Sequence, residues 1–211
     1  MATAADARGE DRQWYIVNRW LEYDGESRAN LLRMIAIGGF YLVQLVQFYW
    51  LEQQAAAAVP FHQRATALAV AGTMVALGVT LCLRRQIFPA ALKYVSATCD
   101  IVLVAALVWL AGGPLSPSTR AFFLVIALSA LRFDLGLIWY TTLGCLLAYE
   151  GLVGWADPTW FDAKHAVPVV DNLLMLVSLG LTGVILGQVI RRVRQAASEY
   201  ATRAERMRGR T

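Results

Sequence analysis

Hydrophobic residues are concentrated in long runs that short polar or charged segments separate. A helix needs about 20 apolar residues to cross about 30 Å of hydrocarbon. The fourth run is the shortest, and it reaches spanning length only if Ser116 and Pro117 begin a helix that continues to Phe133. The pattern predicts an all-α, polytopic membrane protein with a six-transmembrane-helix bundle within residues 29–190. The predicted spans are residues 31–51, 65–83, 94–111, 116–133, 135–153 and 167–190.

The sixth run continues directly into a charged segment that begins with Arg191, Arg192 and Arg194. Around and beyond these arginines, apolar positions recur at alternating spacings of three and four residues, which is the a/d pattern of a coiled coil. Residues 191–211 are therefore predicted to form a cytoplasmic coiled-coil-like helix that pairs in a homodimer. An amphipathic helix lying on anionic lipid is the alternative. The seam residues are Ile190, Val193, Ala197, Tyr200, Ala204 and Met207.

The N-terminal segment, residues 1–28, contains an amphipathic pattern. Trp14, Val17 and Leu21 fall on one helical face, with arginines on the other side, which is typical of a helix in the membrane interface. A helix packed against the cytoplasmic end of the bundle would show the same pattern. Residues 24–26 predict a break before the first span, with Ser27 capping the helix that follows.

The distribution of charge supports this topology. The chain has 211 residues, of which 58% are hydrophobic, and 16 of its 19 Lys and Arg residues fall on one side of the predicted bundle. The positive-inside rule assigns that side, and both termini, to the cytoplasm. The first 30 residues contain no apolar core of a cleaved signal peptide. The net charge of +4 thus reflects membrane topology, so the lipid bilayer is the expected partner and nucleic acid is not.

Motifs of known catalytic chemistry are not found. The sequence has no HExxH, GxSxG, Walker or dinucleotide-binding pattern, and we expect that the chain is not an enzyme. It identifies no cofactor. Cys82, Cys99 and Cys145 all fall within predicted spans and are interpreted as small apolar fillers.

Asp100 is the most informative single residue, because an ionisable group inside a span costs a few kcal/mol unless it is paired or hydrated. It serves either as a polar clasp within the bundle or as a ligand, proton or signalling contact. Together with polar and aromatic residues of other spans it predicts a cavity for a lipophilic small molecule. Aromatic residues at the membrane interface would give a similar list. The candidate ligand-binding residues are Asp100, Gln44, Gln47, Tyr41, Tyr140 and Tyr149.

The predicted outer loops contain carboxylates and both histidines of the chain. His62, Asp162 and His165 are candidate ligands for a divalent cation, with Asp162 and His165 at a plausible local spacing. The alternative is that acidic outer loops arise simply because basic residues are retained on the inner side.

Three short segments carry a resemblance to a known family: LRRQIFPAALKY at 83–94, LRFDLG at 131–136 and LGQVIRRVRQ at 186–195. With the six-span layout, the chain resembles the membrane regions of bacterial class III adenylate and guanylate cyclases and related membrane sensors. The resemblance implies a multi-pass anchor and receptor in a bacterial-type inner (plasma) membrane, whose last span passes a signal to a helix that pairs two protomers. The 21 residues after Ile190 hold no cyclase catalytic domain.

The leading hypothesis is therefore a dimeric membrane anchor or receptor module without its own catalytic domain. It would be either a stand-alone sensor or the membrane part of a longer chain. A small transporter or channel that uses Asp100 and the intramembrane Gln and Tyr residues is the alternative from a different class. An intramembrane enzyme is the third hypothesis, and the lack of paired catalytic residues disfavours it.

Overall fold

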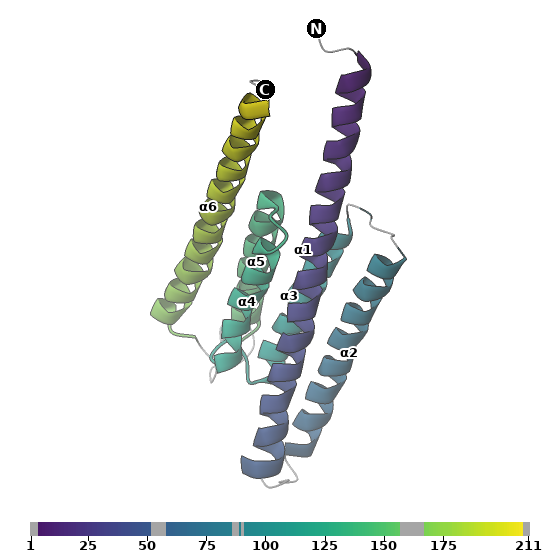
Figure 1. Cartoon of the computed structure of the whole chain (residues 1–211). Helices are drawn as coiled ribbons and strands as arrows, with labels where there is room; N and C mark the ends of the chain where they lie inside the picture. Colours follow the sequence, from purple (N-terminus) through teal and green to yellow (C-terminus); the bar gives the residue numbers. More distant parts are fainter. Residues whose placement is uncertain (1–3, 52–57, 86–88, 90, 157–166, 209–211) are drawn as a thin grey trace. The chain divides into compact units, whose positions relative to one another are not determined.

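The structure is a computed structural model. It describes the backbone of residues 4–51, 58–85, 89, 91–156 and 167–208. Side chains are described from Tyr23 to Glu199, apart from residues 51–58, 86–88, 90 and 156–166. All regular secondary structure in these residues is helical, as the apolar runs predict (Figure 1). The helices are α1 (Ala4–Val46), α2 (Ala58–Arg84), α3 (Leu92–Leu110), α4 (Ala121–Ala130), α5 (Leu135–Ala156) and α6 (Val169–Arg208), with a π-helix η1 (Gln47–Leu51) and a 3-10 helix η2 (Pro117–Arg120).

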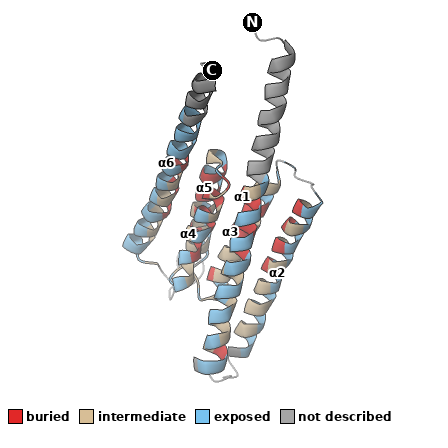
Figure 2. Ribbon diagram, in the orientation of Figure 1, coloured by how far each residue is buried: buried red, intermediate tan, exposed pale blue. Residues whose placement is uncertain are grey.

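Five helical segments are long and apolar enough to cross a membrane. They are Tyr23–Trp50, Val59–Arg84, Leu92–Leu110, Leu135–Trp155 and Val169–Glu199, and the shorter apolar segment Pro117–Ala130 lies between the third and the fourth. Large apolar side chains along these segments are exposed, for example Leu147 at 73% and Leu174 at 60% (Figure 2). Because water would strongly disfavour so much exposed apolar surface, hydrocarbon is the solvent that suits it. The chain is a multi-pass membrane protein.

The chain divides into two compact units, Met1–Ser96 and Ala97–Thr211, and α3 contributes residues to both. In the first unit α1 and α2 form an antiparallel pair (Figure 1). The expected break at residues 24–26 is wrong, because α1 continues through it without interruption. A salt bridge of 2.9 Å from Arg28 to Asp24, one turn earlier, supports the helix there, and Glu26 is buried.

The second unit packs α4, α5 and α6 together with the later part of α3 around one apolar core. Phe122 and Ile126 of α4 and Leu179 of α6 are each fully buried in it. Helix α4 is the most enclosed element, since six of its ten residues are buried. This explains why the fourth apolar run lacks the polar positions that mark the other helices.

Two tight turns join α3 to α4 and α4 to α5. Gly112 and Gly113 end α3 with φ angles of 102° and 89°, which side chains other than glycine rarely adopt. Phe133 has a φ of 51° in the second turn, and Asp134 then caps α5 by accepting a hydrogen bond of 2.9 Å from the backbone N–H of Gly136.

The helix bounds differ from the predicted spans in places where apolar character and helical structure do not coincide. Helix α2 begins at Ala58, so His62 lies on a helix and the predicted loop position is wrong. The fourth segment ends at Ala130 and does not reach Phe133, because the chain turns there. Helix α6 extends unbroken from the apolar run into the charged segment.

Candidate functional site

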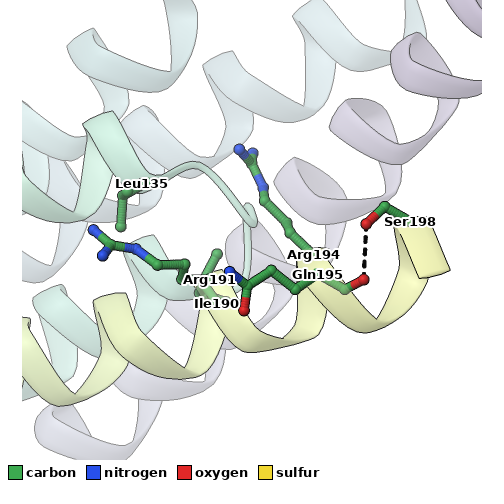
Figure 3. Close-up of a pocket in the computed structure, with 6 residues that line it drawn as sticks. All are labelled: Leu135, Ile190, Arg191, Arg194, Gln195 and Ser198. Carbon is green, nitrogen blue, oxygen red and sulfur yellow. Dashed lines mark hydrogen bonds between the residues drawn. The ribbon is translucent and has the colours of Figure 1, made fainter.

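The second unit has a pocket where α6 changes from apolar to charged. Its volume is about 310 Å³. Leu135, at the start of α5, and Ile190 supply apolar surface, while the rest of the lining is polar and comes from α6 (Figure 3). We call it the arginine pocket, and its lining residues are Leu135, Ile190, Arg191, Arg194, Gln195 and Ser198.

Local packing fixes the apolar side of the arginine pocket. Ile190 is only 5% exposed, because it packs against Ala130 of α4 and Ile138 of α5. One turn earlier α6 lies so close to α5 that a Cβ atom added to Gly187 would be 3.4 Å from Cδ1 of Leu135. The α5–α6 contact therefore holds Leu135 and Ile190 in place beside the arginines.

The two arginines leave α6 on the side of the turn that joins α4 to α5 (Figure 3). The guanidinium of Arg194 donates a hydrogen bond to the backbone carbonyl of Phe133 in that turn. The guanidinium of Arg191 points toward Leu135 (Figure 3), and within the described part of the chain it forms no ion pair. Ser198 donates a hydrogen bond of 2.8 Å to the backbone carbonyl of Gln195, so its hydroxyl is held along α6. The pocket thus combines a cation free to bind an anion with a neighbouring cation that is anchored to the protein.

A buried polar network holds α1, α2 and α3 together in the first unit. The guanidinium of Arg33 donates to Oδ1 of Asn30 at 2.7 Å and to Oγ of Ser96 at 2.5 Å. The Ser96 hydroxyl donates to Oε1 of Glu26 at 3.1 Å, and the Asn30 amide donates to Oγ1 of Thr80 at 2.9 Å. Glu26, Arg33 and Ser96 are each no more than 3% exposed. The network places a carboxylate and a guanidinium in the protein interior with a hydroxyl bridging them.

An aromatic cluster surrounds His62 at the opposite end of the α1–α2 pair. The ring of Phe48, in the π-helix, stacks on the imidazole at a centroid distance of 4.3 Å. Tyr49 meets the same ring edge-on at 6.2 Å, and Tyr41 lies at 6.4 Å. Nδ1 of His62 is buried and has no hydrogen-bond partner within the described residues. The extra residue of a π-turn changes which side chains face α2, and here it directs Phe48 onto His62.

The candidate ligand-binding residues are divided between the two units. In the first unit the hydroxyl of Tyr41 is 3.2 Å from Oγ1 of Thr66, and Gln44 and Gln47 are half-buried further along the same helix. In the second unit the hydroxyl of Tyr140 is 2.7 Å from Oγ1 of Thr98 on an exposed face.

Two further candidates, Asp100 and Tyr149, are buried in the second unit. Asp100 is 7% exposed, and the buried polar residues of this unit include Arg132 at 8%. The ring of Tyr149 packs edge-on against Phe122, with centroids 6.5 Å apart. Tyr149 is therefore a core residue of the second unit, and its surroundings are apolar.

The proposed metal ligands are only partly described. His62 is enclosed by the aromatic cluster, while Asp162 and His165 lie outside the described residues. In the part of the chain that the structure describes, no three His, Cys, Asp or Glu side chains are placed to hold a metal ion. The metal site stays a prediction.

The predicted seam is described only in its first half. Ile190 packs within its own unit, whereas Val193 is 45% exposed and Ala197 is exposed as well. The side chains of Tyr200, Ala204 and Met207 lie outside the described residues. The surface of α6 that is free for a partner helix therefore begins at Val193.

Sequence reasoning missed both the arginine pocket and the buried network. It treated both the arginines of α6 and Arg33 as basic residues of the inner side. The sequence did contain one signal for the pocket. Val177, Val184, Arg191 and Ser198 are seven residues apart, so Arg191 and Ser198 continue the helix face that carries the two valines earlier in the same helix. The partners of Arg33 had no such pattern, because Ser96 is 63 residues away along the chain.

Comparisons of this chain with protein families, with characterised proteins and with solved structures find no match.

Proposed function

We propose that the chain is a membrane anchor and receptor module that dimerises and passes a change in its membrane bundle through α6 to the cytoplasmic helix. The proposal extends the resemblance to the membrane regions of bacterial class III cyclases and related sensors. In it the chain acts on an effector through the charged part of α6. The stimulus is an outer or intramembrane ligand.

The observation that carries this proposal is that one helix, α6, is packed against α5 along its apolar part and is exposed along its charged part. Leu179 is fully buried, and a Cβ atom added to Gly183 would lie 2.6 Å from Cγ2 of Thr142 on α5. From Arg191 to Glu199 every residue is exposed, and α6 extends past the end of α5 (Figure 1). A helix is stiff over this length. A rotation or tilt imposed on α6 by the bundle therefore moves its exposed segment as a lever.

Disulfide crosslinking tests the dimer and its register. In a cysteine-free background, single cysteines at Val193, Ala197 and Tyr200 are expected to crosslink two protomers in native membranes, because a/d positions of paired helices bring Cβ atoms close together. The matched control compares Ala197→Cys with Ser198→Cys, two adjacent and exposed small residues of which only the first is on the seam. Crosslinking yields are measured by non-reducing gel electrophoresis. Equal yields at the two positions would contradict a parallel seam.

The proposal also requires six crossings of the membrane, with both ends of the bundle on one side. The segment Pro117–Ala130 has 14 helical residues, about 21 Å at 1.5 Å per residue, so its crossing needs the turn residues on both sides of it. Labelling of single cysteines by a membrane-impermeant maleimide checks this. Arg28→Cys and Ser198→Cys are expected to react from the same side and Gln63→Cys from the other. If Arg28→Cys and Ser198→Cys react from opposite sides, the segment Pro117–Ala130 does not cross the membrane. The charged part of α6 and the start of the first span would then lie on opposite sides, which contradicts the proposal.

A further inference from the structure

We propose that the arginine pocket binds the phosphate of an anionic phospholipid, whose acyl chain lies along the apolar part of α6. This inference goes beyond the proposed function, since it assigns a ligand class to a site on the second unit and holds whether or not the chain dimerises. Three observations carry it: the cationic lining of the pocket, its apolar edge, and the alignment of both with the lipid-facing surface of α6.

Charge is the first observation. Arg191 and Arg194 line a pocket of about 310 Å³, large enough for a phosphate group and its first ester substituent. Asp134, the residue before Leu135, has a carboxylate that could oppose the binding of an anion. This carboxylate accepts hydrogen bonds from backbone N–H groups at the start of α5 at 2.9 and 3.4 Å. These amides and the helix dipole offset its negative charge. Guanidinium groups bind phosphate oxygens through parallel N–H donors, which makes phosphate the anion that this lining suits.

The apolar edge is the second observation. Leu135 and Ile190 form one side of the pocket, and Ile190 is held by its packing against Ala130 and Ile138. A free phosphate ion, hydrated on all sides, gains nothing from such an edge. A lipid headgroup does, because its glycerol backbone and first methylene groups lie next to the phosphate. The mixture of cations and apolar side chains therefore favours a phospholipid over a soluble phosphate compound.

Alignment along α6 is the third observation. Val177, Val184 and Arg191 are each seven residues apart and so lie in one column on the exposed surface of α6, whereas Gly187, one turn before Arg191, is buried against Leu135. Val177 and Val184 are 56% and 41% exposed, and a Cβ added at Gly180 would meet no atom within 4 Å. An acyl chain can thus lie over the valines and the open glycine, directly above the phosphate held by the arginines.

Ile190 belongs both to the pocket lining and to the predicted dimer seam, but beyond it the two are on different sides of α6. At about 100° per residue, the pocket residues of α6 beyond Ile190 are centred about 130° around the helix from Val193 and Ala197. Lipid binding in the pocket and pairing along the seam do not compete for the same surface. A lipid in the pocket would join α6 to the turn between α4 and α5.

Lipid titration of the full chain tests the site. The purified chain in neutral detergent is titrated with dioleoyl phosphatidylglycerol, and bound lipid is counted by native mass spectrometry. Arg191→Gln is expected to weaken binding about fivefold, the loss that corresponds to one arginine at an anionic headgroup. Arg192→Gln is the matched control, because it removes the same charge from the adjacent residue, which is exposed and does not line the pocket. It is expected to change the affinity less than twofold. Arg191→Lys should retain most of the binding.

Two further arms identify the source of the phosphate. Dioleoyl phosphatidylcholine, which has no net negative charge, is expected to bind at least fivefold more weakly than phosphatidylglycerol. Millimolar glycerol phosphate is expected not to displace the lipid. Equal losses in Arg191→Gln and Arg192→Gln would overturn the proposal, because they would indicate general surface electrostatics. Displacement of the lipid by glycerol phosphate would also overturn the proposal, because it would assign the pocket to a soluble phosphate compound. Equal binding of phosphatidylcholine and phosphatidylglycerol would overturn it as well. Arg191 and Arg192 are exposed and outside the core, so we expect these substitutions to leave the fold intact.

Discussion

Replacing Arg33 with methionine is expected to destabilise the protein by about 3 to 5 kcal/mol, the usual cost of leaving a charged partner buried and uncompensated. Arg33 is 3% exposed and donates hydrogen bonds to Asn30 and to Ser96, and Ser96 in turn donates to the carboxylate of Glu26. Methionine fills much of the arginine volume, but it removes the positive charge that Ser96 links to a carboxylate that is only 1% exposed. The network connects α1 to both α2 and α3, so its loss loosens both of these contacts.

Unfolding of the full chain in mixed micelles by increasing SDS, followed by circular dichroism, measures this loss. Arg28→Met is the matched control, because Arg28 is on the same helix, but its side chain is 70% exposed and its salt bridge to Asp24 is on the surface. Its expected effect is below about 0.5 kcal/mol. Adding Glu26→Gln to Arg33→Met should recover more than half of the stability, since it removes the uncompensated charge. If Arg33→Met were no more harmful than Arg28→Met, the network would not stabilise the unit.

Hydrophobic patterning was sufficient to predict the helical class and five of the spans, because lipid contact imposes a length and a composition on every crossing segment. It was least informative where the protein, and not the lipid, surrounds a helix. Helix α4 shows this, since six buried residues in ten leave little of its surface facing outward, and its length follows from the turns at Gly113 and Phe133. Gly112, Gly113 and Pro114 are a clear turn signal in the sequence, but the sequence does not show how much of α4 the other helices cover.

The polar features could not be found from local sequence for a related reason. Residues 24–26 have the composition of a helix break, yet the helix continues, because Glu26 is held by Ser96, which is 70 residues away. Likewise, Arg191 and Arg194 were predicted only as basic residues of the inner side, and the pocket that they line also needs Leu135 and the turn at Phe133. In both sites the decisive partner belongs to another helix, and one sequence does not show which helices are neighbours.

A single methyl group at the contact between α5 and α6 is expected to have the second-largest effect. In Gly183→Ala the new Cβ would lie 2.6 Å from Cγ2 and 3.0 Å from Cβ of Thr142, which is fully buried on α5 at 2% exposure. Overpacking of this kind costs about 1 to 3 kcal/mol. The backbones approach closely here because glycine has no side chain, as is common where membrane helices pack. We therefore expect α6 to move away from α5 in this variant and its SDS resistance to fall.

A double-mutant cycle separates this clash from other effects of alanine. Thr142→Ala removes Oγ1 and Cγ2, so adding it to Gly183→Ala is expected to restore most of the lost stability, with a coupling free energy above about 1 kcal/mol. Gly180→Ala is the matched control on the same helix, because its Cβ meets no atom within 4 Å, and it should be neutral or slightly stabilising. If Gly183→Ala behaved like Gly180→Ala, α6 could shift freely against α5. A lever must be held firmly at its packed end to move its exposed end, so that outcome would also remove the physical basis for signalling through α6.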